Sequence, residues 1–461
     1  YPFHMPGHKR NRASSADDFL FERDITEISG FDNLHHAEGI LKEAQEYAAQ
    51  IYGTKKCFFS VNGSTAALLA AVSASVNKGG KILVARNCHK AVYHALYLRE
   101  LQPVYIYPHE DQRLGINGGI SPERVERYLE ENTDVQAFLL TSPTYDGVVS
   151  DIKTIAEVVH RHKIPLIVDE AHGAHFKFHK ELPPSSIELG ADMAAISIHK
   201  TGGALTQASA LLINNTVDDK KVLQTINMLQ STSASYLLMS SIDGARYNLD
   251  INGERQLSNA LNLARYARNK LNRIDGIKVY SPQDLKSKGV EFVDETKLCI
   301  NVKGLNLTGF EVYDMLYKNF SVQAELGDLY NVLALISIGT TKKDVDRLIK
   351  SIEIIAKTKK RSTKIKDIEI RQINTEIGIN PREAFYAKKE LVDIKDSLNM
   401  ICGESIMAYP PGIPIISPGE IITYEIINYI NLLKDSGAYF TDAQDKKLNK
   451  ILVVNDTASI S

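Results

Sequence analysis

His199 and Lys200 stand side by side at the end of an apolar run, 195–198. The run predicts a buried strand, and the glycines at 202 and 203 predict a loop after it. An amine at the end of a buried strand is partly desolvated, which favours its neutral, nucleophilic form. Imine formation with a carbonyl compound requires that form. We therefore predict that Lys200 is a reactive lysine rather than a solvated surface residue.

A second apolar run, 164–168, ends in Asp169, and His172 follows three residues later. A carboxylate at the end of a buried strand is unfavourable unless a cationic group faces it. The cation could be a metal ion, a substrate amine or a protonated ring nitrogen. Asp169 is therefore a candidate binding residue.

Two further runs end in residues that suit a flat, phosphorylated ligand. Gly63, Ser64 and Thr65 follow the run 57–61 and begin a predicted helix, where amides and hydroxyls favour a phosphate, although such residues are also ordinary helix caps. His89 follows the next such run, where an imidazole could cover a flat ring or only cap the next helix. Each of these two patterns, taken alone, fits either ligand binding or helix capping.

Between residues 45 and 215 the sequence alternates short β-rich runs with longer helix-like ones. This alternation predicts an α/β domain whose mainly parallel sheet is covered by helices. Ligands of such sheets bind at the carboxyl ends of the strands, where all the residues above are found. A lysine, a strand-end carboxylate, an imidazole and a phosphate-binding turn together form the set that pyridoxal 5'-phosphate requires.

The bulk composition narrows the function further. Apolar residues make up 44% and charged residues 24% of the 461 residues, and the net charge is −2. These values are typical of a globular protein and give no reason to expect a nucleic acid or a membrane as partner. No signal peptide or membrane span is recognised. The cysteines lack metal-ligand spacing, so we expect reduced core thiols in a cytoplasmic protein: Cys57, Cys88, Cys299 and Cys402.

We expect four regions along the chain. An N-terminal segment, 1–40, precedes a large cofactor-binding domain at 41–245. A long helix near 240–273 leads into a smaller α/β domain at 246–360, and a C-terminal domain occupies 361–461.

The chain resembles the ornithine/lysine/arginine decarboxylases of the aspartate aminotransferase fold, in their shorter bacterial form. Nine motifs in order carry the resemblance: "FHMPGHK" at 3–9, "TEISGFDNLHHAEG" at 26–39, "NGST" at 62–65, "RNCHKAVYHAL" at 86–96, "SPTYDGVVSDI" at 142–152, "DEAHGAHF" at 169–176, "SIHKT" at 197–201, "QSTSASY" at 230–236 and "YPPGIPIISPGE" at 409–420. It implies a large domain of pyridoxal phosphate fold type I, and decarboxylation of a basic amino acid to an amine and carbon dioxide in polyamine metabolism.

The resemblance also implies roles for individual residues. Lys200 would hold the cofactor as an imine, and Asp169 would keep the ring nitrogen protonated. His89 would stack on the ring and His172 would border it, with His199 as a further catalytic candidate beside the phosphate. The phosphate itself would be held by Gly63, Ser64, Thr65 and Ser197.

The resemblance further implies a homodimer with shared active sites. Thr232 and Ser233 would approach the cofactor of the partner subunit, although this chain has Ala234 where relatives often have proline. Glu27, Asp32 and Glu404 are candidates for the acidic partner of the substrate's second cationic group. Arginine or lysine is expected as substrate rather than ornithine.

Other functions remain open at this stage. An aminotransferase or aldolase could use the same cofactor groups, as could a relative that binds the cofactor without catalysis. His172, His175 and His179 could instead bind a metal, but this leaves Lys200 unexplained, so we expect no metal. The "VDEAH" sequence of ATPases requires a GxxxxGK[ST] loop, which the sequence lacks.

Overall fold

The computed structural model describes residues 21–111, 114–285, 289–358, 374–408 and 413–455. The "FHMPGHK" motif and the first four residues of "YPPGIPIISPGE" lie outside these ranges. The chain divides into two compact units. The first unit consists of 1–75, 137–142 and 152–258, and the second of 76–136, 143–151 and 259–461.

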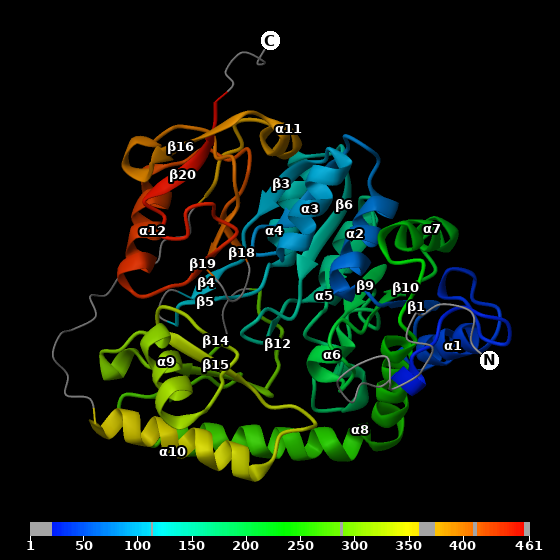
Figure 1. The fold of residues 1–461 in the computed structure, drawn as a ribbon, viewed down its shortest axis with the longest axis horizontal. Coiled ribbons are helices and arrows are strands. Elements are labelled where there is room, and N and C mark those ends of the chain that lie inside the picture. Colours follow the sequence, from blue (N-terminus) through cyan, green and yellow to red (C-terminus); the bar gives the residue numbers. More distant parts are fainter. Residues whose placement is uncertain (1–20, 112–113, 286–288, 359–373, 409–412, 456–461) are drawn as a thin grey trace. The chain divides into compact units, whose positions relative to one another are not determined.

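The main sheet has seven strands in the order β1, β10, β9, β8, β6, β2, β3 (Figure 1). Their bounds are Lys56–Ser60 for β1, Ser209–Ile213 for β10, Met193–Ile196 for β9, Leu166–Asp169 for β8, Val135–Thr141 for β6, Lys81–Ala85 for β2 and Gln102–Ile106 for β3. β6, β8 and β9 pair in parallel, as do β2 and β3, whereas β10 is antiparallel to β9 and β1. The predicted α/β fold with a mainly parallel sheet is confirmed.

The central strands are apolar along their whole length because they are covered on both faces. Every residue of β8, β9 and β10 is buried, which explains why their sequences are continuous apolar runs rather than alternating ones. The helices that follow the strands are α2 (Gly63–Ser75), α3 (Lys90–Arg99), α4 (Pro122–Glu131), α5 (Ile152–Arg161) and α7 (Asp219–Leu229). α2 contacts both β10 and α7.

The core of the first unit joins α1 (Ile40–Tyr52) to β1, β9 and β10. It contains Tyr52, Phe59, Ile196 and Leu212, together with Met239 at the start of α8 (Tyr236–Leu271). α8 confirms the long helix predicted near 240–273. The 3-10 helices of this unit are η2 (Phe21–Arg23), η3 (Leu34–His36) and η4 (Phe176–Phe178).

A short helix, α6 (Ile198–Thr201), follows β9 directly. It contains Lys200, so the prediction that this lysine lies in a loop is wrong. Gly202 continues the turn by donating its amide to the carbonyl of Ile198 at 2.8 Å. The helix forms because Ser197 adopts an extended conformation at the N-cap, with its carbonyl accepting from Lys200 N at 3.1 Å.

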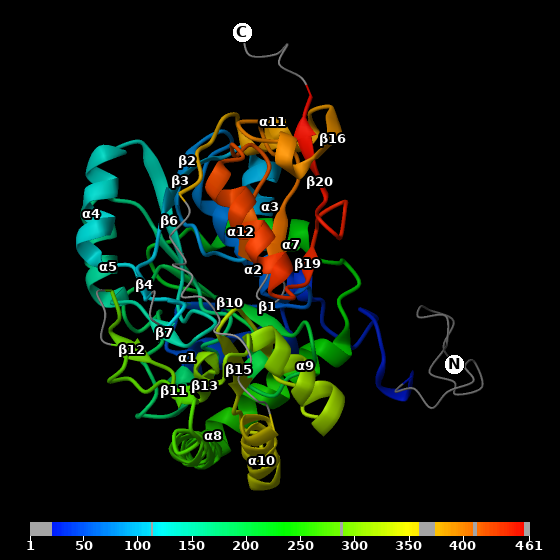
Figure 2. The ribbon, with the colours of Figure 1, turned by 90° about the vertical axis from the view of Figure 1, so that its left-hand side faces the viewer.

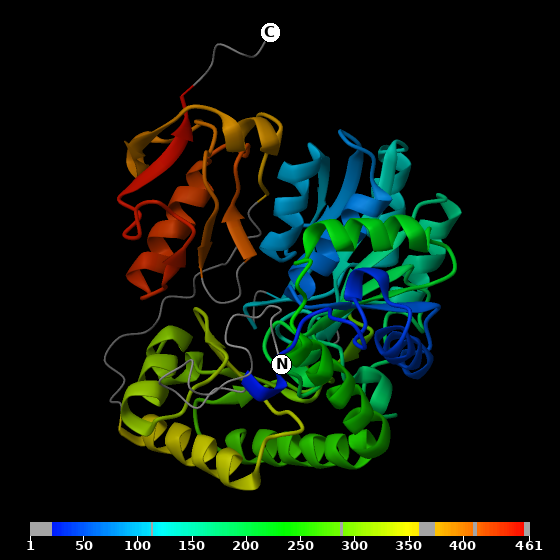
Figure 3. The ribbon, with the colours of Figure 1, turned by 45° about the vertical axis from the view of Figure 1, so that its right-hand side comes forward.

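The second unit contains a four-stranded antiparallel sheet in the order β11, β13, β15, β14. Its strands are Lys278–Val279, Lys297–Asn301, Asn331–Leu335 and Leu326–Gly327 in that order. α9 (Gly309–Phe320), α10 (Lys342–Thr358) and the second half of α8 share one apolar core with this sheet, as the helices at the bottom of Figure 3 illustrate. Smaller elements of the unit are β4 (Glu110–Asp111), β5 (Ile116–Asn117), β7 (Val148–Val149), β12 (Phe292–Val293) and η5 (Lys303–Leu305).

The C-terminal residues of the second unit form two small sheets around α12 (Tyr424–Asp435). β16 (Lys389–Asp393) pairs with β20 (Lys450–Val454), and β17 (Ile406–Ala408) lies between β18 (Ile413–Ile416) and β19 (Phe440–Thr441). Figure 2 shows α12 beside these strands, and α11 (Pro381–Tyr386) contacts α3. A 3-10 helix, η6 (Ile394–Asp396), follows β16. Within the described ranges, no helix is long and apolar enough to cross a membrane.

Candidate functional site

Lys200 and His172 meet where two neighbouring parallel strands end. β8 and β9 run side by side, His172 lies in the turn after β8, and Lys200 lies in α6 after β9. The Nζ atom of Lys200 is 3.1 Å from Nε2 of His172. A hydrogen bond between these nitrogens requires one of them to be neutral, because an ammonium and an imidazolium would repel each other. The geometry can therefore pass a proton between the amine and the ring.

Asp169 is the last residue of β8 and is only 3% exposed. One carboxylate oxygen accepts a hydrogen bond from the amide of Ala171 at 3.2 Å. Burial raises the pKa of Asp169, and the charge of Lys200 and the Ala171 amide only partly oppose this effect. A buried carboxyl of this kind suits a cationic N–H donor on a ligand.

Hydroxyl groups gather at the start of α2. Ser197, at the end of β9, donates its hydroxyl to Oγ of Ser64 at 2.9 Å. Gly63 has a φ of 73°, in the left-handed region that favours glycine. Thr65 lies in the same first turn, whose amides have no acceptor within the helix. Amides and hydroxyls with this arrangement suit a phosphate group.

Two buried hydroxyls on the segment after Lys200 are not indicated by the sequence. Oγ1 of Thr201 and Oγ of Ser209 are buried without a hydrogen-bond partner among the described atoms. Unpaired buried hydroxyls are rare in folded proteins, so a polar ligand in this region would satisfy them. Thr201 lies in the "SIHKT" motif, which is the one signal that could have identified it. These donors and Asp169 fit a ligand with both an anionic group and a protonated ring.

His199 faces a backbone carbonyl rather than an open space. Its Nδ1 is 3.0 Å from the carbonyl oxygen of Ala208, so this nitrogen carries the proton. Burial lowers the pKa of His199, the bond to Ala208 opposes this shift and the charge of Lys200 adds to it. Burial thus favours the neutral form of the His199 ring, which the Ala208 carbonyl holds in place. Among the other histidines, His179 contacts Oγ of Ser258 at 2.8 Å.

His89 lies in the second unit as the N-cap of α3. Its Nδ1 accepts a hydrogen bond from the amide of Ala91 at 3.2 Å. The capping role considered from the sequence is therefore confirmed. The ring is half-buried, and its other nitrogen must carry the proton when Nδ1 accepts.

Asp32 holds a loop together. Its carboxylate accepts hydrogen bonds at 2.9 to 3.1 Å from the amides of Asn33, Glu38, Gly39 and Leu41. Partial burial acts to raise the pKa of Asp32, but these four amides outweigh it and lower the pKa. The loop packs on the "QSTSASY" segment, because His35 Nε2 is 3.0 Å from the carbonyl of Ser231 and the hydroxyl of Tyr236 donates to the carbonyl of Asp32.

The remaining candidates do not converge in one place in the described chain. Thr232 and Ser233 are exposed, as is Glu27. Glu404 is buried in the second unit, where it accepts hydrogen bonds from the amides of Gln444 at 2.6 Å and Leu452 at 2.7 Å. Burial raises the pKa of Glu404, and these amides oppose the shift. Asp32 and Glu404 therefore have structural roles in the chain. All four cysteines are buried and none is in a disulfide, as predicted.

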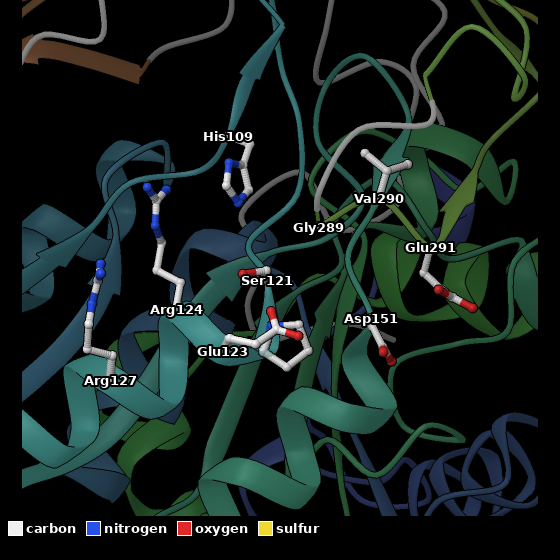
Figure 4. Close-up of a pocket in the computed structure, with 10 residues that line it drawn as sticks. His109, Ser121, Glu123, Arg124, Arg127, Asp151, Gly289, Val290 and Glu291 are labelled. Carbon is white, nitrogen blue, oxygen red and sulfur yellow. The ribbon is translucent and has the colours of Figure 1, made fainter.

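A separate cavity of about 530 Å³ lies in the second unit (Figure 4). Arg124 and Arg127 reach it from α4, while His109, Asp151 and Glu291 reach it from loops. Arg124 also donates to the carbonyl of Tyr107 at 2.6 Å. The lining mixes both charges, and it contains none of the predicted site residues among those the structure describes.

The α/β fold with its mainly parallel seven-stranded sheet is that of an aminotransferase-like large domain. The ureidoglycine-glyoxylate aminotransferase of Bacillus subtilis superposes with a TM-score of 0.54 at 12% identity, over 69% of this chain and 84% of that one. Residues 1–344 match the major domain of the Orn/Lys/Arg decarboxylases, and residues 366–441 match their C-terminal domain. The chain therefore belongs to the Orn/Lys/Arg decarboxylase family, whose members are carboxy-lyases that act on basic amino acids.

Two relatives show the extent of the similarity. The arginine decarboxylase of Bacillus subtilis strain 168 is 39% identical over 473 residues, which cover 99% of this chain and 95% of the relative. The lysine decarboxylase LdcF of Francisella novicida superposes with a TM-score of 0.83 at 22% identity, over 98% of this chain and 79% of that chain.

Proposed function

We propose that this chain decarboxylates arginine to the corresponding amine and carbon dioxide, with pyridoxal 5'-phosphate as cofactor. The observation that carries the proposal is the meeting of Lys200, His172 and Asp169 at the ends of β8 and β9. Arginine is favoured because the arginine decarboxylase relative is 39% identical over nearly its full length, whereas the lysine decarboxylase structure is 22% identical. Lysine is the second candidate.

Residues of the first unit fit the cofactor. Lys200 would hold it covalently, and Asp169 would accept the hydrogen bond of its ring nitrogen. Gly63, Ser64, Thr65 and Ser197 would hold the phosphate, with Thr201 and Ser209 as further hydroxyl donors. When bound, the cofactor supplies an electron sink for the pair left on Cα as carbon dioxide leaves.

Residues around Lys200 control the protonation of its amine and of the cofactor's ring nitrogen. His172 Nε2 is 3.1 Å from the amine of Lys200, so it can remove a proton from that amine or return one. Asp169 is 3% exposed, and a carboxylate enclosed in this way keeps a proton on a ring nitrogen more strongly than one in water. Burial lowers the pKa of His199, which favours an uncharged ring beside Lys200.

The other assignments are also proposals. We propose that His89 stacks on the cofactor ring, and that two copies of the chain form a dimer in which Thr232 and Ser233 face the partner's cofactor. Exposure of these two side chains in the single chain supports this role. Glu27 is the one candidate for substrate recognition whose carboxylate is exposed. The division into domains at 41–245, 246–360 and 361–461 is likewise proposed.

A panel of amino acids tests the function directly. The purified holoenzyme is incubated separately with arginine, lysine and ornithine, and carbon dioxide and the product amine are measured. We expect carbon dioxide and amine in equal amounts from arginine, at the highest kcat/KM of the three. Formation of a keto acid instead of an amine would indicate an aminotransferase. No product from any of the three, with cofactor bound, would indicate a binding protein without this activity.

A further inference from the structure

A buried ion pair between Arg86 and Glu420 joins two of the sequence motifs, and the catalytic proposal uses neither of these two residues. Arg86 follows β2 in "RNCHKAVYHAL", and Glu420 ends the motif "YPPGIPIISPGE". Both belong to the second unit, and Nη2 of Arg86 lies 3.0 Å from Oε2 of Glu420. The two residues are 6% and 1% exposed. A buried pair of this kind is unfavourable unless every donor and acceptor is satisfied.

Each N–H group of Arg86 has an acceptor. A guanidinium has five N–H donors in a fixed plane. Its acceptors are Oγ1 of Thr375 at 3.3 Å, Oη of Tyr93 at 2.7 Å, the carbonyl of Pro414 at 2.7 Å, the carbonyl of Ile415 at 3.1 Å and the carboxylate of Glu420 at 3.0 Å. The guanidinium carbon also lies 5.5 Å and 5.3 Å from the ring centroids of Tyr93 and Tyr105. Lysine could not replace this pattern, because it has three donors and no plane.

Both carboxylate oxygens of Glu420 also accept hydrogen bonds. Its Oε1 accepts from the hydroxyl of Thr375 at 2.9 Å, and its Oε2 accepts from the amide of Ser417 at 2.8 Å as well as from Arg86. The C-terminal stretch 414–420 is therefore fixed to the turn that follows β2.

The same arginine fixes the start of α3. The hydroxyl of Tyr93 accepts from Nη1 of Arg86 and donates to the backbone carbonyl of Arg86 at 3.1 Å. Tyr93 stands one helical turn after His89, so it links that turn of α3 to residue 86. Between them, the amide of Cys88 donates to the carbonyl of Ala85 at 3.0 Å, and His89 caps the helix. The backbone that carries His89 is thus held on one side by the contact of Cys88 to Ala85 and on the other by the contacts of Tyr93 to Arg86.

We propose that Arg86 and Glu420 are positioning residues that fix His89, so that the C-terminal residues act on the cofactor site through this pair. The proposal rests on the proposed role of His89 at the cofactor ring. It assigns the "PGE" end of the last motif to orientation of the site rather than to contact with substrate.

A double-mutant cycle between Arg86→Lys and His89→Ala tests the proposal in the holoenzyme. If Arg86 acts through His89, each single variant lowers kcat roughly tenfold to a hundredfold. The double variant is then no slower than His89→Ala alone, because the orientation of a missing ring has no effect. Visible circular dichroism of the bound cofactor should change in Arg86→Lys as it does in His89→Ala.

Glu420→Gln is the second variant, because it keeps the shape of the side chain if Arg86→Lys fails to fold. Lys81→Met is the matched control. Lys81 lies in β2, the strand that precedes Arg86, and the substitution breaks its exposed ion pair with Asp134, so we expect wild-type kcat and dichroism. Multiplicative effects on kcat in the cycle, or unchanged dichroism in Glu420→Gln with only a lower Tm, would overturn the proposal. Inactivity of the wild-type holoenzyme towards all basic amino acids would instead contradict the proposed function.

Discussion

Two buried carboxyl groups in this chain have opposite surroundings. Glu420 is 1% exposed and is matched by an arginine, a hydroxyl and an amide of the chain itself. Asp169 is 3% exposed and has the Ala171 amide and the charge of Lys200, which leave its pKa raised. Burial at Glu420 is therefore compensated within the protein, whereas compensation at Asp169 is left for a ligand. Unbalanced buried charge of the second kind is typical of functional sites.

The largest expected effect is the loss of activity when Lys200, the lysine that faces Asp169, is replaced. Lys200→Ala should lower the rate of amine production by at least about a thousandfold, because no other group would hold the cofactor covalently. Absorbance of the bound cofactor and product amine are the measurements. Lys180→Ala, which removes an exposed lysine of the same unit, should change neither. Retention of more than a tenth of wild-type activity by Lys200→Ala would contradict the assignment.

Asp169→Asn should lower activity and raise thermal stability. We expect kcat to fall roughly a hundredfold or more, since the amide cannot hold a proton on a ring nitrogen. Without cofactor, Tm near pH 7 should rise. A carboxyl whose pKa is raised by folding stabilises the protein at low pH and loses that contribution as pH rises through the folded pKa, so its removal helps at neutral pH.

The control for Asp169→Asn is the neighbouring buried acid. Glu170 bonds to the amide and hydroxyl of Ser186 at 2.9 Å and 2.8 Å, and burial raises its pKa to about 8. Glu170→Gln should therefore leave kcat within about twofold of wild type. If Glu170→Gln loses as much activity as Asp169→Asn, the assignment of Asp169 to the ring nitrogen is wrong.

Substitution of Glu420, whose charge is balanced within the protein, should lower the free energy of unfolding. Glu420→Met leaves the Arg86 charge buried and unpaired, and such changes cost about 3–5 kcal/mol. The double variant with Arg86→Met should regain most of that loss, because both charges are then absent. Thermal unfolding of the single and double variants measures the difference. Equal Tm values for Glu420→Met and wild type would show that the pair is not important for stability.

Asp32 should give the smallest effect. Asp32→Ala removes the acceptor of four backbone amides and should cost about 1–2 kcal/mol. The pKa of Asp32 is lowered by folding, so its contribution is present above the unfolded value near 3.8 and is lost as pH falls through the folded value. Tm measured from pH 7 downwards should show the two proteins converging in acid. A constant difference below pH 3 would contradict this account.

The residues at the strand ends could be predicted because the apolar runs before them are unambiguous. Asp169 ends β8, as the sequence indicates, whereas β9 ends at Ile196 rather than at 198, so that Ser197 and Lys200 follow the strand. The loop predicted for Lys200 is instead a helical turn, because the Ser197 N-cap and the Gly202 amide together close one turn. Backbone hydrogen bonds decide whether such a turn closes, and a hydropathy pattern does not predict them.

Contacts between distant parts of the chain could not be predicted. Arg86 and Glu420 are 334 residues apart, and neither residue type nor spacing indicates that they pair. Thr201 and Ser209 have no sequence feature that marks their hydroxyls as unpaired, since this depends on the packing around them. Asp32 is a candidate for the acidic partner of the substrate by residue type alone, and the sequence gives no sign that its carboxylate accepts hydrogen bonds from nearby amides.

The central claim is that Lys200 is the residue that carries the cofactor. Borohydride reduction of the holoenzyme, followed by proteolysis and mass spectrometry of the peptides, tests it most directly. We predict a single phosphopyridoxyl adduct on the peptide that contains Lys200, and its absence in Lys200→Ala. An adduct on a different lysine in the wild-type protein would contradict the account.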